Sequence, residues 1–272
     1  RPLRLWDWKF VSRCGAVPTI FCGSLAYGHF RLHRPTEAEG PKICLMTRHD
    51  LPPLIDPSRL PSAETADLFL WPELAYHHAI VESSTNPRDE ATIAAHWPLT
   101  AGKVNAYRNR VSGYLQQTSL SLGANLLVGC ERLSVDDGRI QTFNSLVYVD
   151  PQVGVVGSYD KVHRAPFREF APSYWKWLQI AVPVCYARGN EIAPFHVTSG
   201  DDRLLKFGCG LCFDVAFPWH FRRHFGSDKP DFFVLAGSEA SDATGALSRL
   251  LLRMARLRAI ETCRPIVRNT HL

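Results

Sequence analysis

The chain has 272 residues, of which 46% are hydrophobic and 21% are charged. This length and composition are typical of a globular protein with one large core, and they exclude a disordered chain. The net charge of +5 is small and the basic residues are scattered, which argues against nucleic-acid binding.

The first 40 residues differ in pattern from the rest. Residues 1–13 combine two tryptophans with basic residues, which suits either a membrane interface or an ordinary arm. Residues 14–27 are the most apolar run, but they are shorter than the roughly 18–20 residues that span a bilayer. Residues 35–40 are polar and bounded by proline and glycine. We therefore expect a linker there, between a membrane-proximal segment, residues 1–40, and a globular domain, residues 41–272.

The first half of the domain alternates short apolar runs with turns, which is typical of strands. A turn at residues 136–138 and a second short turn near residue 151 indicate hairpins. Mixed polar and apolar spacing over residues 92–123 predicts a helix. The expected strands are residues 42–47, 68–71, 125–130, 139–149 and 153–159.

The second half predicts strands at 178–184, 192–197, 204–212 and 231–235, one more from residue 266, and helices at 217–225 and 245–263. In the last helix Leu247, Leu250, Leu251, Met254, Leu257 and Ile260 form one apolar stripe, which we expect to be buried. Arg258 lies near this stripe and needs a partner, which Glu261 at i+3 could supply. The interleaving of strands and helices predicts two sheets covered by helices.

Candidate chemistry lies at the ends of three strands. Residues 204–218, LLKFGCGLCFDVAFP, predict a strand that ends in a tight turn presenting Cys212. A thiol with an ordinary pKa of about 8.5 needs a base or a positive field to attack a carbonyl. The run DLFLWPE ends at Glu73, and VGVVGSYDK ends at Lys161. Taken singly, these residues would be a loop carboxylate, a surface lysine and a core thiol.

Eight cysteines show no regular framework, so we interpret most of them as buried free thiols. Cys209 and Cys212 form a CxxC, but no second CxxC or histidine pair accompanies it, which disfavours zinc. The pair also ends a strand, whereas a redox CxxC should open a helix.

Four segments carry a resemblance: WPE at 71–73, YDKVHRAPFREFAP at 159–172, CFDVAFP at 212–218 and MARLRAIETCRPIVRNT at 254–270. In this order they resemble the nitrilase, or carbon–nitrogen hydrolase, superfamily, and within it the apolipoprotein N-acyltransferases of bacterial envelopes. The resemblance implies an α/β fold, the nitrilase-like αββα sandwich, here incomplete at its C-terminus. Residues 25–32 would then be the apolar remnant of a membrane segment.

The resemblance also implies roles for the site residues. Cys212 would be the nucleophile, Glu73 the general base, and Lys161 the cation that stabilises charge on the carbonyl oxygen, with no metal or cofactor required. Glu169 matches an acidic position of the family, in FREF where FGEY is usual, and we expect it to hydrogen-bond Lys161 or to help position the base. Phe213 and Asp214 replace the Tyr and Glu of the usual CYE, and the shorter Asp214 is expected to weaken a supporting contact.

The implied function is an N-acyltransferase that moves a fatty acyl chain from a phospholipid, through a thioester, to the α-amino group of a diacylglyceryl-cysteine apolipoprotein. It would act at the bacterial inner membrane, on the periplasmic side. The alternatives are a soluble nitrilase-type amidase with the same three residues, and a non-catalytic domain. The FREF and MARLRAIE segments favour the acyltransferase. Residues 234–245, VLAGSEASDATG, depart from the family near the expected acceptor site.

Overall fold

The computed structural model describes residues 8–32, 40–47, 66–82, 86–96, 100–136, 138–171, 185–190, 194–226, 229–239, 242 and 244–271. The chain divides into two units, Arg1–Gly40 and Pro41–Leu272. In the first unit, helix α1 spans Trp8–Leu32, and large apolar side chains such as Phe21 and Leu25 are exposed. Among the described helices, none has both the length and the apolar character that crossing a membrane requires.

The first sheet of the second unit contains six strands among the described residues, in the order β1-β2-β4-β5-β6, with β3 also paired to β4. The strands β1, β2, β3 and β4 run parallel, whereas β4, β5 and β6 form antiparallel hairpins. Their bounds are β1 Ile43–Leu45, β2 Leu68–Leu70, β3 Tyr76–Val81, β4 Asn125–Asp136, β5 Arg139–Asp150 and β6 Gly154–Asp160.

The second sheet has the order β10-β9-β8-β7 among the described residues. The strands β8, β9 and β10 are parallel, and β7 is antiparallel to β8. Their bounds are β7 Phe195–Thr198, β8 Leu204–Leu211, β9 Phe232–Ser238 and β10 Ile266–His271.

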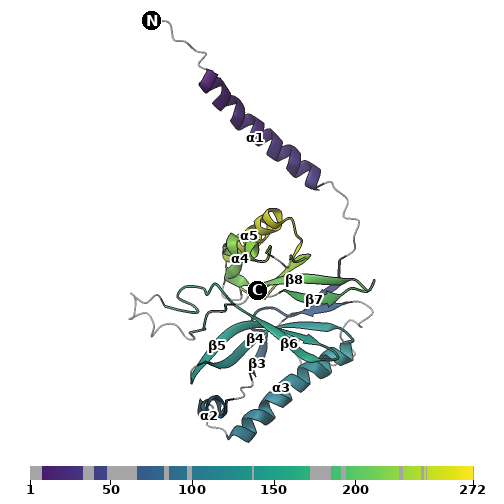
Figure 1. Cartoon of the computed structure of the whole chain (residues 1–272), viewed down its shortest axis with the longest axis vertical. Helices are drawn as coiled ribbons and strands as arrows, with labels where there is room; N and C mark the ends of the chain where they lie inside the picture. Colours follow the sequence, from purple (N-terminus) through teal and green to yellow (C-terminus); the bar gives the residue numbers. More distant parts are fainter. Residues whose placement is uncertain are drawn as a thin grey trace. The chain divides into compact units, whose positions relative to one another are not determined.

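The two sheets pack face to face, and helices cover their outer faces, which gives four layers (Figure 1). Helices α2 (Pro87–His96) and α3 (Ala101–Leu122) cover the first sheet, and α4 (Pro218–Arg223) and α5 (Ala246–Thr262) cover the second. Between the sheets, Leu127 and Tyr148 pack with Phe207 and Val234. Two sheets each apolar on both faces therefore need helices to bury their outer sides.

A buried amide ties the two sheets together. The Nδ2 of Asn269, on β10, donates to the backbone oxygens of Leu70 at 2.7 Å and Met46 at 2.9 Å. Asn269 is 7% exposed, so these bonds lie in a low-dielectric interior, where an unmet donor would be costly. The amide fixes the second sheet against the ends of β1 and β2.

Several predicted elements differ from those observed. The single helix expected over residues 92–123 is two helices, α2 and α3, and Pro98 stands between them, where proline cannot continue a helix. Strand β3 was not predicted, because the adjacent exposed His77 and His78 break the apolar alternation. The strand expected at 178–184 lies outside the described residues.

The buried face of α5 was predicted wrongly. Leu251, Ala255, Arg258 and Thr262 are its buried residues. Much of the expected stripe is exposed, with exposed fractions of 37% for Leu247, 48% for Leu250, 51% for Leu257 and 71% for Ile260. The rings of Phe221 and Phe233 already fill this layer, so the helix face carrying the small Ala255 fits against the sheet. Arg258 does pair with Glu261, at 3.1 Å.

Two histidines are buried at α4. His220 belongs to α4 and His224 follows it, and the His224 ring packs against Phe233 at 5.2 Å between centroids. Neither ring nitrogen of His224 has a hydrogen-bond partner within the described part of the chain. Burial lowers the pKa of His220 below its ordinary value and lowers the pKa of His224 to about 3.

These histidines predict a loss of stability in mild acid. Below pH 6.5 these two histidines take up protons in the unfolded chain but stay neutral in the folded chain. The free energy of unfolding should therefore decrease as the pH decreases. His224 alone would contribute about 2 kcal/mol of loss between pH 6.5 and 5. Urea unfolding across this range should show a weaker pH dependence for His224→Gln. The exposed His196→Gln should retain the wild-type dependence; equal dependence in both variants would contradict the assignment.

Candidate functional site

Glu73 lies on a turn that crosses the next strand at close range. The chain leaves β2 at Leu70 and turns at Glu73 and Leu74, the latter with a positive φ of 51°. A Cβ at Gly129 of β4 would lie 2.1 Å from the Pro72 carbonyl oxygen, so only glycine allows this approach. Glu73 is 5% exposed, and its Oε2 accepts from the Ser238 N–H at 2.8 Å.

Lys161 follows β6 and is 2% exposed. Its Nζ donates to Glu73 Oε1 and to Glu169 Oε1, each at 2.8 Å. Burial opposes the ammonium charge, but the carboxylates of Glu73 and Glu169 outweigh it and raise the pKa of Lys161. Lys161 is therefore a buried cation held between two carboxylates, and the expected contact of Glu169 with Lys161 is present.

The sequence analysis missed Asn144, a fourth member of this cluster. The Asn144 Nδ2, on β5, donates to Glu73 Oε1 at 2.7 Å and Glu169 Oε1 at 2.9 Å. Its backbone oxygen accepts from the Lys161 N–H at 2.9 Å. The available signal was an amide within the mostly apolar stretch FNSLVYV, where a buried polar group needs partners.

Cys212 begins the short 3-10 helix η4 (Cys212–Ala216) directly after β8, and its φ is +44°. A non-glycine residue in this conformation is held there by its surroundings, as at a sharp turn that presents a side chain. Burial and then the charge of Glu73 raise the pKa of Cys212 to about 12, while Lys161 lowers it. The resting thiol therefore keeps its proton, and attack on a carbonyl requires a base.

The three predicted strand-end residues meet in one cavity. Cys212, Glu73, Lys161 and Glu169 all line a space of about 280 Å³. The other lining residues are Leu74, Ala165, Phe167, Arg168, Tyr186 and Ser238. A cavity that holds a thiol, two carboxylates and an ammonium group can support nucleophilic attack with general base help.

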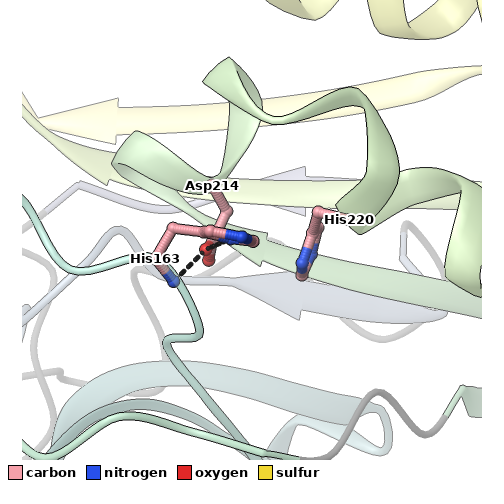
Figure 2. A group of neighbouring side chains, drawn as sticks. All are labelled: His163, Asp214 and His220. Carbon is pink, nitrogen blue, oxygen red and sulfur yellow. Dashed lines mark hydrogen bonds and ion pairs between the residues drawn. The ribbon is translucent and has the colours of Figure 1, made fainter.

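Asp214 fixes the turn that carries Cys212. Its Oδ2 accepts from the Leu211 N–H at 2.9 Å and the Tyr159 hydroxyl at 2.6 Å. Its Oδ1 accepts from the backbone N–H of His163 at 2.7 Å and also contacts Nδ1 of the His163 ring at 3.0 Å (Figure 2). Burial alone would raise the pKa of Asp214, but the hydrogen bonds from His163 and Tyr159 lower it. All these donors reach the Asp214 carboxylate, and the expectation that its shorter side chain weakens a supporting contact stays a prediction.

The ring of His163 is held from both ends. Trp219 Nε1 donates to its Nε2 at 3.1 Å, which leaves the proton on Nδ1 for Asp214. The ring also stacks on Phe217, with centroids 4.0 Å apart. His163 thus links the segment after Lys161 to the segment after Cys212. Phe213 contacts Phe217 edge to face, and it is not among the described residues that line the cavity.

His163, Asp214 and His220 have donor atoms within 4.8 Å of one another, as three metal ligands would (Figure 2). The Nε2 of His220, however, lies 2.9 Å from the Cys209 carbonyl oxygen, which can only accept, so this nitrogen carries a proton. Asp214 already accepts from three residues. Hydrogen bonding therefore accounts for the cluster, and its donor set does not fit a metal ion.

Comparison with known proteins places these observations in a family. An apolipoprotein N-acyltransferase of Allorhizobium ampelinum is 26% identical over 268 residues, covering 92% of this chain and 46% of that protein. The apolipoprotein N-acyltransferase of Agrobacterium fabrum is 25% identical over 262 residues, covering 93% and 47%. The chain therefore spans about half the length of the curated relatives it matches.

Solved structures share the fold. A mutant of the amidase from Nesterenkonia sp. AN1, with the acetamide moiety of fluoroacetamide on its active-site cysteine, has a TM-score of 0.52 and 20% identity. It covers 87% of this chain and 78% of its own. This likeness shows the nitrilase-like αββα fold. The sequence profile of the carbon–nitrogen hydrolases matches residues 51–272, and the chain belongs to the carbon–nitrogen hydrolase family.

Proposed function

We propose that this chain is an acyl-transferring enzyme in which Cys212 carries the acyl group as a thioester. The observation that supports this most directly is the position of Lys161, whose ammonium group bonds Glu73 and Glu169 in the cavity that Cys212 also lines. The relatives named apolipoprotein N-acyltransferase support acyl transfer as the reaction class.

In the first step Glu73 takes the proton of the Cys212 thiol as the sulfur attacks the ester carbonyl of the donor. The base is needed because the pKa of this thiol, about 12, keeps it protonated at neutral pH. The Sγ–C bond forms and the ester C–O bond breaks. Glu73 then passes the proton to the departing alkoxide. Lys161 stabilises the negative charge on the carbonyl oxygen meanwhile.

In the second step an amine attacks the thioester. The C–N bond forms, the S–C bond breaks, and Glu73 moves a proton from the amine to the leaving thiolate. We propose a phospholipid as the donor and the α-amino group of a diacylglyceryl-cysteine apolipoprotein as the acceptor. The enzyme would act at the periplasmic face of the bacterial inner membrane. These assignments rest on the names of the relatives and on the sequence motifs.

An acyl-enzyme should be detectable by mass spectrometry. We expect the chain, incubated with phosphatidylethanolamine vesicles, to gain one fatty acyl mass on Cys212. Cys212→Ala should gain none. Cys263→Ser, which removes a different and exposed thiol, should still be acylated. A diacylglyceryl-cysteine peptide should clear the adduct and become N-acylated.

The same experiment separates the alternatives. Adducts from small amides, without any from lipid, would contradict the acyltransferase proposal and favour an amidase that uses water. Absence of adducts from both would favour a non-catalytic domain. Acylation of Cys212→Ala would contradict the assignment of the nucleophile.

Removing the Lys161 cation should destabilise the fold as well as abolish acylation. Lys161→Met leaves Glu73 and Glu169 buried without their shared partner, which typically costs about 3–5 kcal/mol. Urea unfolding should show this loss at pH 7. The double variant Lys161→Met/Glu169→Gln should recover part of the stability; no recovery would contradict charge repulsion as the cause.

Asp214→Asn should loosen the turn that presents Cys212. The Nδ2 of the new amide must face either the donors of Leu211 and Tyr159 or those of His163, so we expect about 3 kcal/mol lower stability. Alkylation of Cys212 by iodoacetamide should change in rate as the turn relaxes. The exposed Asp201→Asn should leave both the urea midpoint and the alkylation rate almost unchanged. Similar behaviour of the two variants would argue against this role for Asp214.

A further inference from the structure

Arg168 differs from the other charged residues that line the cavity, because those residues pair with one another. Glu73 and Glu169 share the Lys161 ammonium group. Arg168 also lines the cavity, and its side chain has no ion-pair or hydrogen-bond partner among the described residues. Arg168 is exposed, so this residue lies where the cavity meets solvent. Its guanidinium donors therefore have no partner among the described residues and can take a ligand.

A closed turn holds Arg168 at this position. The Phe167 N–H donates to the Phe170 carbonyl oxygen at 2.8 Å, and the Glu169 N–H donates to Ala165 at 3.0 Å. The Ala165 N–H in turn donates to Glu169 Oε2 at 2.7 Å. Glu169 thus fastens the turn with one oxygen and binds Lys161 with the other. The backbone of Arg168 is therefore fixed relative to the reacting groups.

Two further arginines lie near this turn. Arg164 donates to the Tyr186 carbonyl oxygen at 2.7 Å and covers the Phe170 ring at 4.8 Å. Burial and then the like charge of Arg188 lower the pKa of Arg164, while Cys185 and Glu169 act in the opposite direction. Glu131 accepts from the Tyr186 hydroxyl at 2.7 Å. Arg164 and Arg188 thus add positive charge beside the turn that carries Arg168.

We propose that Arg168 is a substrate-binding residue that takes an anionic group at the mouth of the cavity, and that this group is the phosphate of the phospholipid acyl donor. A guanidinium group matches phosphate oxygens in a bidentate manner. In a phospholipid, only the glycerol unit separates the phosphate from the ester carbonyl, so both fit at one cavity mouth. The motif that this segment resembles has glycine here, so the guanidinium is a feature of this chain. The identity of the anion rests on the proposed function, whereas the anion site does not.

The anion site can be tested without acyl transfer. Iodoacetate and iodoacetamide alkylate a thiol by the same displacement, in which the S–C bond forms and iodide leaves, but only iodoacetate is an anion. The ratio of their rates at Cys212 should fall about fivefold in Arg168→Gln, equivalent to about 1 kcal/mol. Arg168→Lys should restore part of the ratio. Arg253→Gln, an exposed change of equal charge on α5, should retain the wild-type ratio.

The phosphate assignment needs a second comparison. Acylation of Cys212 from phosphatidylglycerol vesicles should fall in Arg168→Gln relative to acylation from diacylglycerol dispersed in neutral detergent. Equal losses with the two donors would overturn the phosphate assignment, and an unchanged iodoacetate ratio would overturn the anion site. If the wild-type chain is acylated by neither donor, the proposed function fails, and the alkylation ratio still decides whether Arg168 binds an anion.

Discussion

The site depends on a single buried ammonium group. Lys161 donates to Glu73 and Glu169 at 2.8 Å each, and Asn144 donates to the same two oxygens. Two carboxylates so close together in a low-dielectric interior would repel each other strongly without a cation. The contacts join residues that follow β2, lie on β5 and follow β6. The electrostatic requirement of the site therefore also fixes how these segments meet.

The thiol and its base have opposite needs, which the arrangement reconciles. Burial favours a protonated Cys212, so in the proposed mechanism the thiol stays unreactive until a substrate enters. Glu73 has its oxygens held by Lys161, Asn144 and Ser238, so its carboxylate is oriented before the reaction. Groups that are already oriented lose little entropy when the transition state forms. Asp214 does the same for the backbone beneath Cys212.

The sequence predicted the part of the site that follows from strand ends. Glu73, Lys161 and Cys212 each end an apolar run, and strand ends in such sheets converge. Asn144 could not be assigned in advance, because its partners lie 71 and 25 residues away in the chain. The buried face of α5 was missed for a related reason. Its packing depends on the rings of Phe221 and Phe233, and helical periodicity contains no information about them.

The Asn269 amide has a consequence for the order in which the chain acquires its structure. It bonds backbone oxygens 223 and 199 residues earlier, near β1 and β2. During synthesis, β1 and β2 leave the ribosome long before this partner exists, so their final docking must wait. Contacts at such sequence separation slow folding and leave early strands open to wrong pairings. The short lengths of β1 and β2, three residues each, limit that exposure, since short strands offer little edge to another chain.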